Sequence, residues 1–132
     1  MKKKTQKEIF NNYPKIFRQH TLPPSQTAMV WGLECGEGWM NLIDTLCHDI
    51  QTYIDENHTE QIEATQVKQK FGGLRFYYRP YNKIIDELIH KASEDSFDTC
   101  ENCGDIKDVQ LSKKGWITPM CKMCRLLIGG EK

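Results

Sequence analysis

Cys100-Glu101-Asn102-Cys103 opens the stretch that decides how the C-terminal end of this chain folds, and Cys121-Lys122-Met123-Cys124 closes it. The two pairs are separated by 17 residues. Paired cysteines at this spacing present four thiolates at the corners of a tetrahedron, which suits Zn²⁺. All four positions are then filled by protein, so none is left for an activated water. The sequence therefore predicts a structural metal site, with zinc preferred and a rubredoxin-type iron as the alternative, whose ligands are Cys100, Cys103, Cys121 and Cys124.

The rest of the chain is long enough for one small core. A chain of 132 residues buries roughly two-thirds of its unfolded surface. We therefore expect residues 1–98 to form an α+β core and residues 99–132 to form the four-cysteine module. In the core, amphipathic helices should pack on a β-hairpin or small antiparallel sheet. The module should be a zinc ribbon or a truncated treble clef.

Hydrophobic periodicity places three elements in the core. Apolar residues at helical spacing predict a central helix over about 38–57 and a second helix over about 80–97, with Pro80 in its first turn. Between them, residues of about 62–78 alternate around a Gly-Gly pair, which predicts a hairpin.

The turn sets the register of that hairpin. If Gly72-Gly73 forms a two-residue turn, Phe71 lies opposite Leu74 and Lys70 lies opposite Arg75. Like charges that face each other across two strands destabilise the pair, so an acidic group is expected nearby.

Charge is unevenly distributed, although the formal net charge is zero. The zero balance excludes a generally basic nucleic-acid binder. Between residues 19 and 67 there is no Lys or Arg, whereas eight acidic residues occur there: Glu34, Glu37, Asp44, Asp49, Asp55, Glu56, Glu60 and Glu63. The next segment, from Lys68 to Lys83, has five basic residues and no acid.

One side of the hairpin is the candidate binding surface, and it comprises Lys68, Lys70, Arg75, Tyr77 and Arg79. Cations with an aromatic residue among them are typical of a small nucleic-acid or phosphate patch. Docking of the same cations onto the acidic block explains the composition equally well. Both interpretations stay open at this point.

A hydrolase-type enzyme is the least favoured class. Its residues would come from the region of Glu34, Glu37, Asp44 and His48, but helical spacing spreads such residues over a solvated face. No histidine lies between the two cysteine pairs, which argues against nucleases built on treble-clef folds. No set of nucleophile, base and orienting residue is visible.

The chain has no apolar run near the roughly 20 residues of a membrane span, and its basic N-terminus is not followed by a signal core. We therefore expect a cytoplasmic protein with reduced cysteines. Cys35 and Cys47 remain outside the quartet, and Cys47 is expected to be a small core residue. The oligomeric state is left open.

Several motifs together resemble a family of small uncharacterised proteins encoded by bacteriophages and prophages. They are Cys35-Gly36-Glu37-Gly38-Trp39, the segment from Val67 to Tyr77, the two cysteine pairs, and Gly115-Trp116. The resemblance covers most of residues 30–125. It implies a genomic setting without an assigned activity, and it implies that six residues are framework positions: Gly36, Gly38, Trp39, Gly72, Gly73 and Trp116.

The sequence thus favours a non-enzymatic phage or prophage accessory protein with a structural zinc site. In that setting it would bind a protein of the bacterial host or of a defence system. The alternative is nucleic-acid or nucleotide binding through the basic hairpin Lys68–Arg79 and the zinc module.

Overall fold

The computed structural model describes residues 4–23, 25, 27, 29, 32–111 and 117–128. Trp116 therefore lies outside the described residues. The elements follow one another as α1 (Gln6–Asn12), η1 (Arg18–Thr21), β1 (Leu33–Glu34), η3 (Glu37–Trp39), α2 (Met40–Asn57), β2 (Glu63–Lys70), β3 (Gly73–Arg79), α3 (Lys83–Ser96), β4 (Gln110–Leu111), β5 (Pro119–Met120) and α4 (Lys122–Ile128).

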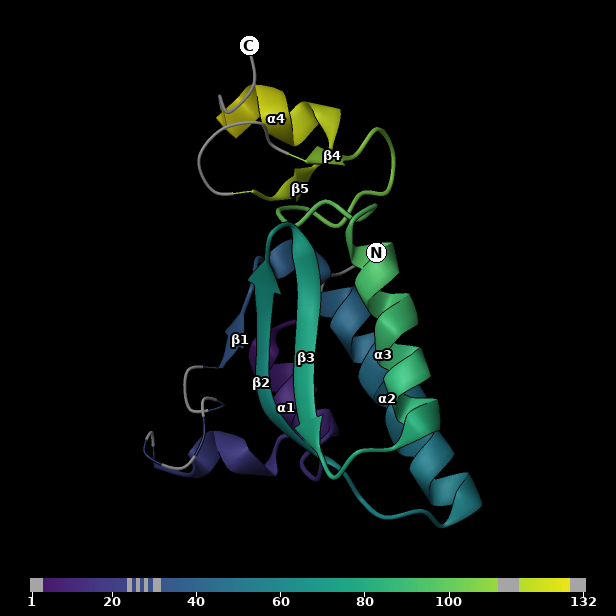
Figure 1. Ribbon diagram of the computed structural model, residues 1–132. Coiled ribbons are helices and arrows are strands. Elements are labelled where there is room, and N and C mark those ends of the chain that lie inside the picture. The colour runs from purple at the N-terminus through teal and green to yellow at the C-terminus, as the bar shows by residue number, and fades with distance from the viewer. Residues whose placement is uncertain are drawn as a thin grey trace.

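A three-stranded sheet in the order β1-β2-β3 forms one layer of the core. Helices form the second layer: α2 and α3 pack against each other, and in the view of Figure 1 α3 runs beside β3 at the edge of the sheet, in front of α2. Apolar residues of both layers form one buried cluster, which includes Ile43, Val67, Phe76 and Ile85. The predicted α+β class is confirmed. The sheet is mixed rather than purely antiparallel, because β1 runs parallel to β2.

Helix α2 is the central helix that the periodicity predicts. One stripe of its side chains is buried in the core, including Ile43, Leu46, Ile50 and Ile54. A 3₁₀ turn, η3, precedes the helix, and His58 ends it in a left-handed conformation at φ 53°. The long amphipathic period therefore located this helix to within two residues.

Helix α3 begins at Lys83, three residues later than the sequence predicts. Asn82 is its N-cap, and the Asn82 side chain accepts hydrogen bonds from the backbone N–H groups of Ile84 and Ile85. These bonds satisfy donors that the first turn of a helix leaves unpaired. The Asn82 side chain was the signal in the sequence that fixes this boundary, and Pro80 lies outside the helix.

The predicted register of the hairpin is wrong by two residues. Lys70 pairs with Gly73 and Lys68 pairs with Arg75, so that Phe71 and Gly72 form the turn. A slip of two residues keeps side chains on the same face of the sheet, and the bulge between Ala64 and Gln66 changes the alternation only at the start of β2. The five candidate residues therefore still share the outer face, which we call the hairpin face.

Packing around the turn explains the register. A Cβ atom on Gly73 would lie 2.5 Å from the ring of Phe97, and one on Gly72 would lie 2.7 Å from Leu111. Only glycine allows Phe97 and Leu111 to approach the strand and the turn this closely. As a result Phe71 takes a turn position at φ 54° and is 67% exposed.

Replacing Phe71 with Asn should stabilise the protein, because a left-handed conformation costs an ordinary residue about 1–2 kcal/mol and Asn-Gly is the preferred sequence for such a turn. The Lys70 ammonium, 5.6 Å from the centre of the Phe71 ring, contributes only about 0.5 kcal/mol at an exposed site. We expect the free energy of unfolding in urea to rise by about 0.5–1 kcal/mol. Phe71→Ala should show no such gain, because it loses the ring and keeps the strain.

A membrane span is not found among the helices of the described residues, since none of them is both long enough and apolar enough.

Candidate metal centre

The four predicted ligands come together in space. The Sγ atoms of Cys100, Cys103, Cys121 and Cys124 all lie within 4.8 Å of one another. The distance between the Cys103 and Cys121 Sγ atoms is 3.7 Å, and a tetrahedron with Zn–S bonds of about 2.3 Å has edges of about 3.8 Å. The cysteines are free thiols. Their geometry therefore fits a metal ion that is held by four thiolates.

Local structure places each pair of cysteines. The first pair lies in a tight turn after α3, where Gly104, at φ 87°, donates its N–H to the carbonyl oxygen of Cys100 at 2.8 Å. Strands β4 and β5 pair between the two cysteine pairs. Cys121 directly precedes α4, and Cys124 lies in the first turn of that helix. The closing helix is the feature that a truncated treble clef adds to a ribbon of strands.

Backbone donors surround the sulfur of Cys100. Burial opposes ionisation of this thiol, but hydrogen bonds from the backbone of Cys121, Cys103 and Asn102 outweigh it and lower the pKa of Cys100 to about 7. Donors that stabilise a thiolate favour metal binding, since the thiolate is the ligand. The Asn102 side chain also donates to the Cys124 sulfur at 3.3 Å.

Arg125 forms buried hydrogen bonds that connect segments of the module. It is only 8% exposed, and its Nη1 donates to the carbonyl oxygens of Asp108 and Met120 at 2.8 Å each. Its Nη2 lies 3.5 Å from the Asp108 carboxylate. A buried charge needs such partners, so Arg125 ties α4 to both segments that precede it. Nothing in the local sequence distinguishes Arg125 from a surface arginine, so this role could not be predicted from the sequence.

Glu101 fastens the module to the core. Its carboxylate accepts hydrogen bonds from the Gly36 N–H at 2.7 Å, from the Gln69 side chain at 3.1 Å and from the Thr118 hydroxyl. Its backbone carbonyl accepts from Gly38 N–H at 2.7 Å. One residue between two metal ligands therefore bonds to the start of α2, to the hairpin and to the second half of the module.

Gly36 and Gly38 make this approach possible. A Cβ atom on Gly36 would lie 2.3 Å from the carbonyl oxygen of Glu101, and one on Gly38 would lie 2.2 Å from that of Cys100. Close by, the indole N–H of Trp39 donates to the Thr99 carbonyl at 2.9 Å. The framework role that the resemblance implies for these residues has a physical basis here, because they form the seat of the metal module.

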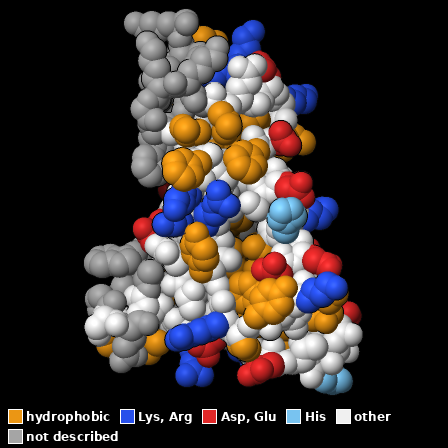
Figure 2. Space-filling model, viewed as in Figure 1, with side chains coloured by type: hydrophobic (Ala, Val, Ile, Leu, Met, Phe, Trp, Pro, Cys, Tyr) orange, Lys and Arg blue, Asp and Glu red, His pale blue; other side chains and the backbone are white. Residues whose placement is uncertain are grey.

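The hairpin face is open to solvent. Figure 2 shows Lys and Arg side chains over the hairpin, with hydrophobic side chains next to them towards the metal module. Lys70, Tyr77 and Arg79 are exposed, whereas Lys68 and Arg75 are half-buried. Exposed apolar residues beside the hairpin tip are Phe71, Phe97, Leu111 and Ile117.

The acidic block does not neutralise these cations. Glu34 lies beside Lys68 in the sheet, but within the part of the chain that the structure describes, no acid is within ion-pair distance of the five hairpin-face residues. Glu63, which pairs with Arg79 along the strands, forms its ion pair with Arg18 at 3.4 Å. The open interpretation of the hairpin is therefore favoured over internal docking.

The residues considered for catalysis do not assemble into a site. His48 lies 3.5 Å from Asp49 rather than bonding to Asp44. Among the described residues, the four cysteines are the only group of three or more His, Cys, Asp or Glu side chains whose ligand atoms gather for a metal.

The two remaining cysteines lie outside the quartet, with Cys47 buried and Cys35 half-buried. Cys47 is fully buried in the core, and burial raises the pKa of its thiol well above the usual value. Burial and the nearby carboxylate of Glu101 raise the pKa of Cys35 to about 12. Thiols with such high pKa values stay protonated near neutral pH and are poor nucleophiles.

Comparison with known proteins found no matching family model, curated protein or solved structure. Any function must therefore be argued from the residues of this chain.

Proposed function

We propose that this chain is a non-enzymatic binding protein with a structural zinc ion, and that its hairpin face binds an acidic partner protein. In the phage or prophage setting that the sequence resemblance implies, the partner would be a protein of the bacterial host or of a defence system, and binding would take place in the bacterial cytoplasm. The cysteine quartet fills every position of a tetrahedral metal and leaves none for catalysis. Zinc is the preferred metal for four thiolates.

One observation carries the proposal of binding. Four cations and a tyrosine share the outer face of one hairpin, and in the described residues none of the four cations has an acidic partner. Cations without counter-ions, next to exposed apolar residues such as Phe71 and Ile117, have the composition of a recognition surface. An acidic partner would supply the missing counter-charges.

Binding of single-stranded nucleic acid is the second candidate. It is favoured by the exposure of two aromatic residues among the cations: Phe71 is 67% and Tyr77 is 44% exposed. Bases stack on such rings, and the cations follow the phosphates.

A charge reversal on the hairpin face tests the proposal. Proteins from a bacterial host lysate that are retained by the immobilised wild-type chain should be lost with Lys70→Glu/Arg75→Glu, because the change turns attraction into repulsion. The matched control is Lys7→Glu/Lys91→Glu, which alters net charge equally at exposed positions away from the hairpin and should retain the same proteins.

A second measurement separates the two candidates. Fluorescence anisotropy with an oligothymidylate at 50 and 200 mM NaCl should show no hairpin-dependent binding if the partner is a protein. Tight, salt-sensitive binding that Lys70→Glu/Arg75→Glu abolishes would instead establish the nucleic-acid function. If the wild-type chain retains neither proteins nor oligonucleotide, the proposed function is wrong.

A further inference from the structure

The outer edge of β3 has backbone groups that no neighbouring strand uses. In the strand order β1-β2-β3, β3 is an edge strand. The Leu74 N–H donates to the Ser96 hydroxyl at 2.9 Å, and the Leu74 carbonyl accepts from Ser93 at 2.9 Å. The backbone of Leu74 therefore points away from β2 and towards α3.

Alternation along an antiparallel strand extends this orientation to Phe76 and Tyr78. Their backbone N–H and C=O groups face the same open side as those of Leu74. Among the described residues, no side chain bonds to the backbone of Phe76 or Tyr78 on this side. Beyond the part of the edge that Ser93 and Ser96 cover, such backbone groups can pair with an added strand.

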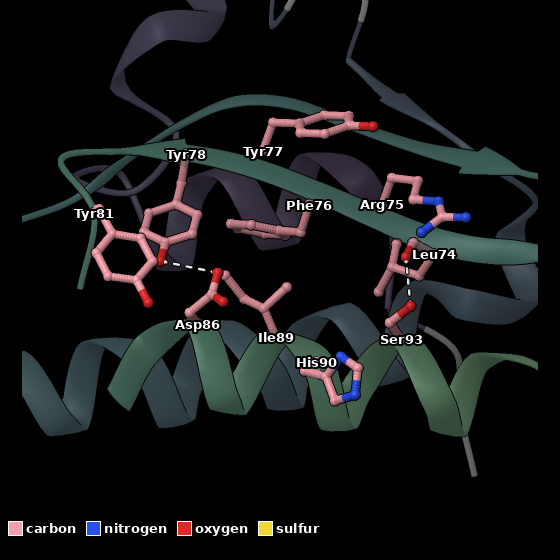
Figure 3. A pocket seen from close by; sticks show the side chains of 10 residues that line it. All are labelled: Leu74, Arg75, Phe76, Tyr77, Tyr78, Tyr81, Asp86, Ile89, His90 and Ser93. Atoms are coloured by element: carbon pink, nitrogen blue, oxygen red, sulfur yellow. Dashed lines mark hydrogen bonds between the residues drawn. The ribbon is translucent and has the colours of Figure 1, made fainter. Parts of the chain in front are cut away.

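A groove runs between this edge and α3, with a volume of about 400 Å³. Figure 3 shows Phe76 and Ile89 at its centre, Tyr78 and Tyr81 at one end, and Arg75 and His90 at the other. Its two ends are closed by contacts between β3 and α3, namely the bond from Ser93 to Leu74 and the bond from the Tyr78 hydroxyl to Asp86 at 3.2 Å.

We propose that this groove binds a short extended segment of the partner protein, which pairs with the edge of β3 between these two contacts. The proposal rests on the proposed function and names the form in which the partner is recognised. A polypeptide in extended conformation presents N–H and C=O groups at the two-residue repeat that Phe76 and Tyr78 require. A nucleic acid has no such repeat.

The charged residues at the groove indicate which side chains the bound segment carries. Arg75 has no acidic partner in the described residues, and its Nε is buried without a hydrogen bond. Asp86, at the other end, already accepts from Tyr78. The segment should thus carry an acidic side chain beside Arg75. Because side chains alternate along a strand, an apolar residue next to this acid would face α3 and rest on Ile89 and Phe76.

The test uses the full-length zinc-loaded chain and a displayed library of random linear heptapeptides. Selection should enrich peptides in which an acidic residue adjoins an apolar one. In ¹⁵N-labelled protein, an enriched peptide should shift the amide signals of Phe76 and Tyr78. Methylation of single backbone nitrogens of the peptide should weaken binding at least ten-fold at every second position and change it less than two-fold at the positions between, because only alternate N–H groups face β3.

Three variants separate this groove from the hairpin face. Arg75→Glu should weaken the peptide at least ten-fold, and the control Lys7→Glu, an exposed position outside the groove, should change its affinity less than two-fold. Lys70→Glu/Arg79→Glu, on the hairpin face but outside the groove lining, should weaken it less than Arg75→Glu alone. If enriched peptides depend on Lys70 and Arg79 and show no alternation with methylation, the groove proposal is wrong while the proposed function stands. Failure to enrich any peptide, or shifts of the Phe76 amide caused by an oligothymidylate or by self-association, overturns it as well.

Discussion

Removal of the metal with a chelator is expected to unfold the four-cysteine module and to lower the melting temperature of the whole protein by at least about 10 °C. Among the described residues of the module, the buried cluster around the cysteines contains one other hydrophobic residue, Met120, with Val109 packed against it. Structural zinc contributes about 10–16 kcal/mol in small zinc peptides, and a metal ion held by these cysteines would supply the stability that so small a cluster lacks.

The effect should reach the α+β core through Glu101. When the turn that holds Glu101 loses its metal, the N–H of Gly36 and the side chain of Gln69 lose this acceptor, and Gln69, which is only 5% exposed, also loses its bond to the Ile117 carbonyl. A hydrogen bond contributes about 0.5–1.5 kcal/mol, and one to a charged group about 1.5–3 kcal/mol. The loss of these bonds at the contact between core and module should lower the stability of the core.

Thermal melts by circular dichroism, with and without chelator and after zinc is restored, measure this effect, and elemental analysis should find one zinc per chain. Cys100→Ser should reproduce the chelated state. Met123→Ser is the matched control, because Met123 lies between two ligands, is 64% exposed and binds no metal. An unchanged melting curve after verified removal of the metal would contradict the structural role.

Gly38→Ala should be the most damaging single substitution outside the metal ligands, with a loss of about 3 kcal/mol or more in the free energy of unfolding. Its new methyl group would overlap the carbonyl carbon of Glu101, at 2.6 Å, as well as the Cys100 oxygen. These are backbone atoms of the tight turn that holds Cys100 and Cys103, and they cannot move without displacing a predicted metal ligand. The substitution should therefore also weaken metal binding.

Urea unfolding and competition for zinc with a coloured chelator report the two effects separately. Glu37→Ala is the control, since Glu37 belongs to the same 3₁₀ turn and is exposed. It should change stability by no more than about 0.5 kcal/mol. Equal stabilities of Gly38→Ala and Glu37→Ala would show that the module does not seat on this turn.

Sequence patterns located the parts of this protein that depend on neighbours in the chain. The spacing of Cys100, Cys103, Cys121 and Cys124 predicted a cluster that the structure confirms. The helical period predicted α2 closely, because the buried stripe is a local property of eighteen residues. Helix α3 begins three residues later than the helical period predicts, because the N-cap at Asn82 outweighs the proline two residues earlier.

Contacts between segments that lie far apart in the chain could not be predicted from the sequence. In the sequence, Glu101 resembles any solvated surface residue. Only the fold brings Gly36, Gln69 and Thr118 to its carboxylate. The groove beside β3 likewise exists only because the fold places α3 along the edge of that strand.

Spacing and periodicity act over a few residues, and they predict the cysteine cluster, the α+β class and the face of the hairpin on which the five candidate residues lie. The register of the hairpin depends instead on contact between Phe97 and Gly73, and the position of the four-cysteine module depends on contact between the turn at Cys100 and Gly38. Steric fit between segments far apart in the chain has no signature in either local sequence.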